Sequence, residues 1–280
     1  MTIRLMLRIT AKLLLGVWCV ITVLPTLSAV LLSFHSTISI YRYPLGFAGT
    51  WQVQNFGVAW RGPAGGVGIP TLLVNSATAA ALGIALSLTT GSAAAYVIRY
   101  LRPRWRAWIL RLCVGGMVVP VILLMIPIYY AVNGLGVLNE PAIVGVVYGG
   151  LALPGTVLIL QAFYADFPTE LVDAAMVEGA SHRATFVRVI LPMSRGPLST
   201  VAVLVLISIW GEAQLGYILL QNPRSETLAV GLLGFQGEYL TDYGALFAGL
   251  TLAMVPVLAA YLVFSKHILR GVALSSGVKG

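Results

Sequence analysis

Charge is the scarcest feature of this sequence: charged residues make up 9% of its 280 residues, and hydrophobic residues make up 59%. A soluble domain holds about 25% charged residues, so a soluble fold of this composition would expose large apolar patches. The same apolar content excludes a disordered chain, and glycine and proline without a three-residue period exclude collagen. The composition therefore predicts a protein that lies in the lipid bilayer.

The sequence also lacks the motifs of common enzymes and metal proteins. Cys19 and Cys113 are the two cysteines, too few for a disulfide scaffold or a zinc site. No Gly-Lys pair occurs, which excludes a phosphate-binding loop of the Gly-x-x-x-x-Gly-Lys kind, and no His-Glu-x-x-His or Gly-x-Ser-x-Gly is present. We therefore expect no cofactor, no metal site and no catalytic activity in this chain.

Long apolar runs predict an all-α polytopic membrane protein, because a helix of about 20 residues satisfies its own backbone inside lipid. Pro120, Pro127 and Pro154 are expected to kink the third and fourth spans. Gly145 and Gly149 form a small-xxx-small pattern that can bring two helices close together. The six expected spans are 13–34, 72–98, 108–131, 142–163, 198–220 and 244–265.

Lysine and arginine are unevenly shared between the two sides of these spans. Fourteen of the 17 lie in segments on the same side as the termini, and only Arg42, Arg61 and Arg224 lie on the other side. The positive-inside rule then predicts that both termini are cytoplasmic. Because topology accounts for the net charge of +8, we expect no nucleic-acid partner.

The cytoplasmic segment 164–197 is the longest on its side, and its first part predicts a short helix. Pro168 presets a helical φ and Thr169 can cap the helix. Glu170 and Asp173 fall in the first turn, where the helix dipole favours negative charge. We expect this helix to run for about ten residues, to Glu178.

A sharp turn and a second helix should follow. Gly179 can adopt the left-handed conformation that ends a helix, and Ser181 can cap a second helix that stops before Pro192. Two roles are open for the first helix: it lies on the inner leaflet, or it docks in a groove of a cytoplasmic protein. Anionic headgroups repel an acidic first turn, which favours docking.

The segment 170–181, followed by Ile190-Leu191-Pro192, resembles the EAA loop of ABC importer permeases. The usual pattern is Glu-Ala-Ala, three variable residues and Gly, and here Asp173 stands for the first Glu. The sequence from about residue 10 to 280 is similar to the second permease subunit of binding-protein-dependent sugar importers of the maltose-transporter type. The other matching motifs are Asn75-Ser76, Ala94-Ala95-Tyr96, Leu135-Gly136-Val137-Leu138-Asn139, Thr227-Leu228-Ala229-Val230-Gly231-Leu232 and Gly277-Val278-Lys279-Gly280.

The resemblance implies an ABC importer type I permease fold and a coupling helix that sits in a cleft of a separate ATP-binding subunit. The coupling residues would be Glu170, Asp173, Ala174, Ala175, Glu178 and Gly179. The expected partners are a second homologous permease, two ATP-binding subunits, an extracytoplasmic solute-binding protein at outer segments such as 35–71 and 221–243, and membrane lipid.

The resemblance also suggests how the chain is organised and what it carries. We expect 1–71 to hold the N-terminal tail, first span and outer loop, 72–265 to form the core permease domain, and 266–280 to be a cytoplasmic tail. A carbohydrate is the expected substrate. The alternatives are a permease for glycerol phosphate or another polar solute, an ion-gradient-driven secondary transporter, and a membrane scaffold without a pathway.

Glu212 is the one acidic residue inside an expected span. A lone charge in the membrane is costly, so such a residue usually faces a polar cavity or a partner. It could line the substrate pathway, bond to another helix or lie near the membrane end. Gln214 could contact a sugar hydroxyl or form a buried bond between helices. Related permeases usually have Asn where this chain has Gly211.

Overall fold

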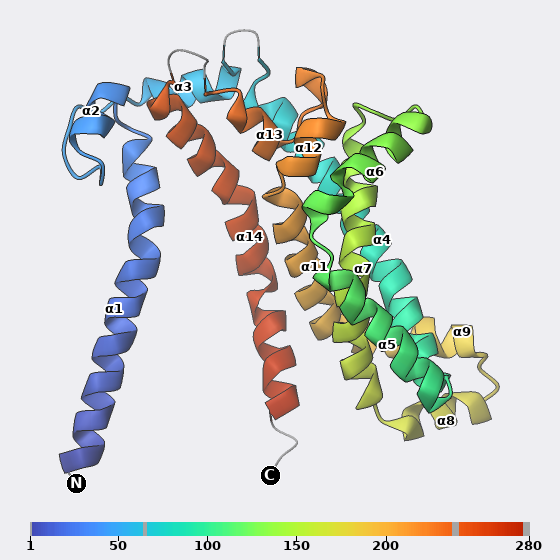
Figure 1. The fold of residues 1–280 in the computed structure, drawn as a ribbon. Helices are drawn as coiled ribbons and strands as arrows, with labels where there is room; N and C mark the ends of the chain where they lie inside the picture. Colours follow the sequence, from blue (N-terminus) through green and yellow to red (C-terminus); the bar gives the residue numbers. More distant parts are fainter. Residues whose placement is uncertain (1, 64–65, 237–240, 277–280) are drawn as a thin grey trace. The chain divides into compact units, whose positions relative to one another are not determined.

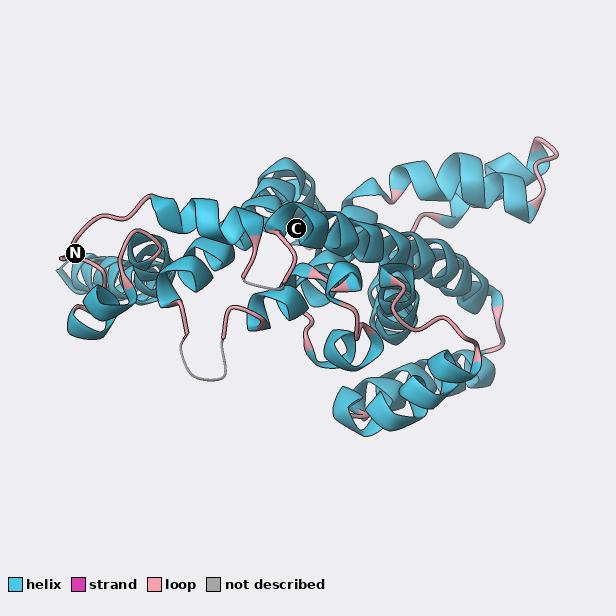
Figure 2. Cartoon of the chain, turned by 90° about the horizontal axis from the view of Figure 1, so that it is seen from above, coloured by secondary structure: helices cyan, strands magenta, loops and turns pink. Residues whose placement is uncertain are grey.

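The computed structural model describes residues 2–63, 66–236 and 241–276, and these residues hold helices and no β-strand (Figures 1 and 2). The predicted all-α class is confirmed. The long helices are α1 (Thr2–Leu32), α4 (Ile69–Tyr100), α5 (Pro103–Val118), α6 (Val121–Gly134), α7 (Pro141–Ala165), α11 (Arg195–Trp210) and α14 (Tyr243–Ser276). The short ones are α2 (Thr37–Arg42), α3 (Gln54–Arg61), α8 (Thr169–Val177), α9 (His182–Thr185), η1 (Phe186–Ile190), α10 (Leu191–Met193), α12 (Gln214–Leu219), η2 (Pro223–Ser225) and α13 (Leu228–Leu233).

Four described helices are each long and apolar enough to cross a membrane: Arg8–Leu32, Ile69–Tyr100, Pro141–Ala165 and Tyr243–Val263. Two further spans follow if each of two bent helix pairs counts as one. The pair α5 and α6 is bent by 94°, and the pair His182–Met193 and α11 is bent by 77°. The expected six spans are therefore reached only when broken helices are included.

The expected third span, 108–131, is broken at residues 119 and 120. Pro120 has no N–H and holds Val119 in an extended conformation (φ −70°, ψ 116°), so the helix cannot continue through it. The predicted kink at Pro120 is confirmed in this stronger form. Helices α6 and α7 continue past Pro127 and Pro154, and the kinks expected at these two prolines stay predictions.

The expected fifth span, 198–220, also differs from a single helix. Helix α11 ends at Trp210 with Gly211 as its C-terminal cap, and α12 begins three residues later, at Gln214. The Glu212 carboxylate accepts a hydrogen bond from the Leu215 N–H at 2.7 Å, which satisfies one free donor at the start of α12. Hydropathy alone does not predict this break, because the residues on both sides of it are apolar and the cap at Glu212 is a local hydrogen bond.

The chain folds as two compact units, one formed by residues 1–70 and 231–255, the other by 71–230 and 256–280. In the first unit, the segment after α1 is fastened by buried polar side chains. Asn55 donates to the carbonyls of Ser33 (2.9 Å) and His35 (3.0 Å). The His35 ring in turn lies 3.0 Å from the Gly46 carbonyl.

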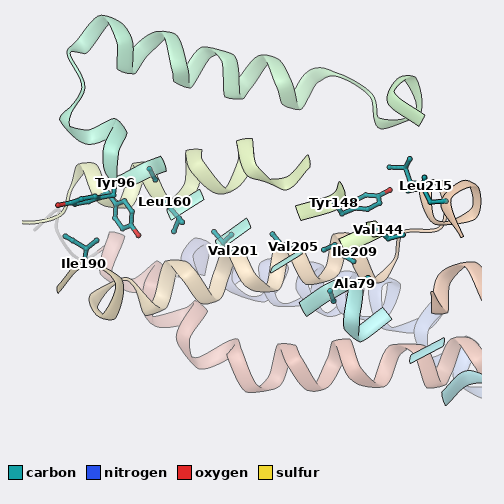
Figure 3. Close-up of a cluster of buried hydrophobic side chains, with 14 of the residues drawn as sticks. Ala79, Tyr96, Val144, Tyr148, Leu160, Ile190, Val201, Val205, Ile209 and Leu215 are labelled. Atoms are coloured by element: carbon teal, nitrogen blue, oxygen red, sulfur yellow. The ribbon is translucent and has the colours of Figure 1, made fainter. Parts of the chain in front are cut away.

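The core of the second unit forms where α7 packs against α4 and α11 (Figure 3). A β-carbon on Gly149 would lie 2.8 Å from the Gly83 carbonyl oxygen, and one on Gly145 would collide with the Ala79 carbonyl, so α4 and α7 touch backbone to backbone. The close contact predicted from the small-xxx-small pattern is confirmed. Further along the same pair, Ser87 and Thr156 form a buried 2.7 Å hydrogen bond.

Candidate functional site

The loop helix α8 forms where the sequence predicts it. Pro168 occupies the cap position and Glu170 lies in the first turn. Thr169 is the first helical residue, so it does not cap the helix as predicted, because Pro168 already fixes the extended conformation before it. The helix ends at Val177, one residue before the expected end at Glu178.

Gly179 ends α8 in a Schellman turn. Its φ is +85°, and its N–H donates to the Met176 carbonyl at 3.0 Å. The N–H of Ala180 donates to the Ala175 carbonyl at 3.0 Å. These two bonds satisfy carbonyls that the helix end leaves free. The left-handed conformation predicted for Gly179 is confirmed, and glycine reaches it without a side-chain clash.

One side chain fastens α8 to the bundle. Val172 is 3% exposed and belongs to the core cluster that also contains Phe167 and Ile190. The predicted coupling residues Glu170, Asp173, Ala174, Glu178 and Gly179 are exposed, and Ala175 is half-buried.

The exposed face of α8 is more apolar than the motif alone suggests. Leu171, Met176 and Val177 are exposed, and Val177 reaches 89%. The EAA motif does not predict these three exposed residues, because it specifies only the alanines, the acid and the glycine. The feature of the sequence that could have indicated Leu171, Met176 and Val177 is the high apolar content of this loop segment, which lies outside the expected spans.

The second loop helix begins as predicted but ends later. The Ser181 hydroxyl accepts a hydrogen bond from the Ala184 N–H at 3.3 Å, which confirms the cap. The expected end before Pro192 is wrong. A π-helical turn, η1, precedes Pro192 and Leu191 donates to the Phe186 carbonyl five residues earlier, a wider turn that accommodates the proline ring and its missing N–H.

The end of α4 contacts the segments of the chain that precede and follow α8. Arg99 donates from Nη1 to the Tyr164 carbonyl (2.8 Å) and from Nη2 to the Phe167 carbonyl (3.0 Å), at the end of α7. The ring of Tyr96 lies 5.0 Å from that of Phe186, after α8. In the sequence, Arg99 is recognisable only as one of the basic residues that set the topology, because these partners lie 65 and 68 residues away.

Asn139 organises the opposite end of α7. It is the one non-glycine residue with positive φ (+64°) in the described ranges. Its Oδ1 accepts from the N–H groups of Gln221 (2.6 Å) and Asn222 (2.8 Å), and its own N–H donates to the Leu219 carbonyl at 2.9 Å. The 135–139 motif therefore holds the segment that follows α12.

Asn75 and Ser76 fasten the same segment further on. The Asn75 amide donates to the carbonyls of Arg224 (2.9 Å) and Glu226 (2.8 Å), and the Ser76 hydroxyl accepts from the Leu228 N–H at 2.7 Å. Burial raises the pKa of the Glu226 carboxyl above its ordinary value. The motif residues at the start of α4 thus fix residues 224–228. Part of the expected outer segment 221–243, residues 237–240, lies outside the described residues.

Glu212 and Gln214 lie at the break between α11 and α12. Glu212 is half-buried and bonds to the backbone of α12, whereas Gln214 is exposed. The hydroxyl of Tyr148, on α7, is buried and has no hydrogen-bond partner among the described residues. A carboxylate and an amide therefore lie at the break of an interrupted membrane helix.

Bundled apolar helices, a broken helix with polar groups and an exposed loop helix are features of a membrane transport subunit. The described residues contain no group of three His, Cys, Asp or Glu side chains that could hold a metal ion. Residues 83–274 match the family described as "binding-protein-dependent transport system inner membrane component". The chain belongs to this family, and its resemblance to ABC importer permeases is confirmed.

Curated relatives match along most of the chain. The diacetylchitobiose uptake system permease protein NgcG of Streptomyces coelicolor is 29% identical over 93% of this chain and 85% of its own length. The melibiose/raffinose/stachyose import permease protein MelC of Bacillus subtilis is 29% identical over 81% of each chain.

A solved structure shares the fold. It is the crystal structure of a bacterial ABC transporter involved in the import of the acidic polysaccharide alginate, which matches with a TM-score of 0.76 and 18% identity over 93% of this chain and 96% of that one. The expected type I permease fold is confirmed. The terminal motif 277–280 lies outside the described residues.

Proposed function

We propose that this chain is a permease subunit of an ATP-driven importer and forms half of a translocation pathway for a carbohydrate. Two observations support this function. The chain belongs to a family of binding-protein-dependent inner-membrane components, and relatives such as NgcG and MelC are named for the uptake of sugars. Membership favours an importer over an ion-driven transporter or a scaffold.

The exposure of helix α8 on the surface of the chain supports coupling to a separate ATPase. It is fixed to the bundle through Val172 and ended by the hydrogen-bonded turn at Gly179, and it exposes Asp173 and Ala174 with the half-buried Ala175 beside them. Small side chains permit a close approach by a partner groove, and the flanking apolar residues supply contact area. Because the sequence has no phosphate-binding loop, the energy comes from a partner subunit.

The full assembly would hold a second permease, two ATP-binding subunits at the side of α8, and a solute-binding protein at the other side. This arrangement places both termini in the cytoplasm, as the distribution of arginine and lysine predicts. The segments 35–71 and 221–243 would face the binding protein. Closure of the ATP-binding subunits would switch the paired permeases between inward-open and outward-open states.

Glu212 and Gln214 are the proposed contacts to the solute. Carboxylate and amide groups bind sugar hydroxyls by hydrogen bonds, and both residues lie where helix α11 is interrupted. A broken membrane helix commonly marks a binding site, because its backbone groups must line a polar cavity.

The test is uptake by the reconstituted complex of the four kinds of subunit in proteoliposomes. The sugar is the one that the purified binding protein retains in a ligand screen. With ATP inside, uptake should continue when ionophores remove the proton and sodium gradients. Uptake that stops with the gradients while ATP is still present would contradict the proposed function.

A further inference from the structure

The last turns of α4 meet the loop hairpin at two separate places. Tyr96, Arg99 and Tyr100 are spaced so that they share one face of the helix. Arg99 contacts the backbone just before α8, through the Tyr164 and Phe167 carbonyls at 2.8 and 3.0 Å. A single guanidinium therefore joins the last turn of α7 to the start of the loop.

The two tyrosines contact the chain after α8. The ring centroids of Tyr96 and Phe186 are 5.0 Å apart, and those of Tyr100 and His182 are 5.4 Å apart. The Tyr100 hydroxyl also donates to the Tyr96 hydroxyl at 3.3 Å. The same short stretch of α4 thus holds the entry to α8 and the exit from it.

We propose that Arg99, supported by Tyr96 and Tyr100, is the positioning residue through which displacement of α8 reaches the membrane-spanning bundle. This inference rests on the proposed docking of α8 and adds the route of transmission. The route continues along α4, which touches the α7 backbone at Gly83 and Gly149. Close-packed helices move as stiff bodies, so a displacement at the end of α4 is not absorbed locally.

The chemistry of the contact requires arginine. The planar guanidinium reaches two carbonyls at once, whereas a lysine ammonium of the same charge is a single point on a flexible stem. Arg99 is half-buried against the loop. Arg102, three residues later, is exposed and provides a matched control, since its removal changes the net charge equally.

The experiment compares Arg99→Gln, Arg99→Lys and Arg102→Gln in the complete reconstituted importer. Two quantities are measured: solute transported per ATP hydrolysed, and cross-linking of an Ala174→Cys side chain to the ATP-binding subunit. Arg99→Gln should lower transport per ATP by about fivefold or more while the cross-link persists, as expected for lost coupling between sites. Arg99→Lys should recover less than half of that loss, and Arg102→Gln should resemble the parent.

Three results would overturn the proposal: an unchanged ratio in Arg99→Gln, full recovery by Arg99→Lys, or loss of the cross-link in Arg99→Gln. If Arg99→Gln does not accumulate in the membrane, Tyr100→Ala is the decisive variant, because Tyr100 is 48% exposed and its truncation spares the core. Its transport per ATP must then fall. Absence of the cross-link in the Ala174→Cys protein with Arg99 intact is a different result, and it would count against the proposed function itself.

Discussion

Substitution of Gly179 separates the conformation of the α8 turn from its packing. A β-carbon at this position would have no atom within 4 Å, so steric collision inside the chain is excluded. The φ of +85° remains, and an alanine in the left-handed region costs about 1–2 kcal/mol. Asparagine tolerates this region, and a β-branched valine is strongly disfavoured there.

These costs set an order for the transport activity of the variants. Each 1.4 kcal/mol lost by the native turn lowers its population against alternatives by about tenfold. We therefore expect ATP-dependent uptake to fall in the order Gly179, Gly179→Asn, Gly179→Ala, Gly179→Val. The valine variant should abolish transport and loosen the coupling of ATP hydrolysis while it still inserts into the membrane.

The assay is the initial rate of uptake, normalised to the amount of permease in the membrane. Gly134→Ala is the control, because a β-carbon there also has open space and the residue lacks a left-handed φ. It should transport normally. Normal uptake by Gly179→Val, or an asparagine variant no better than valine, would refute the reasoning.

Two further predictions concern the bundle and its outer end. Gly149→Ala should destabilise the purified protein by about 1–3 kcal/mol, because the new methyl would press on the Gly83 backbone. The control is Gly150→Ala, which has open space for a methyl and should not lower the melting temperature. Equal melting temperatures of the two variants would contradict the close contact. Asn139→Ala removes the acceptor of two amide N–H groups, a loss of about 1–3 kcal/mol, and should make residues 221–228 faster to cleave in limited proteolysis. Asn139→Asp keeps the acceptor and should protect the segment; equal cleavage of both variants would contradict this role.

The helix and turn of the loop were predictable because their signals are local. Proline before the helix, acid in its first turn and glycine after its end each act on neighbouring backbone. The apolar spans were predictable for a similar reason, since lipid imposes one length and one polarity on every span.

The remaining features were not predictable, because they depend on contacts between residues far apart in the sequence or on one local effect that offsets another. The helix continues through Pro192 because a π turn relieves the clash, and nothing in the sequence marks that turn. The roles of Arg99 and Asn139 appear only after folding, when carbonyls and amides from other helices come within reach. The assignment of the coupling and solute-contact residues stays a prediction.

Docking of α8 on an ATP-binding subunit is tested most directly by disulfide cross-linking in the intact assembly. Cysteine is placed at Ala174 after Cys19 and Cys113 have been changed to serine. Val172→Cys is the control, because this side chain is buried against the bundle. We expect Ala174→Cys to cross-link to cysteines in the partner groove and Val172→Cys to remain unlinked. Failure of Ala174→Cys to link to any ATP-binding subunit of the assembly would contradict the account.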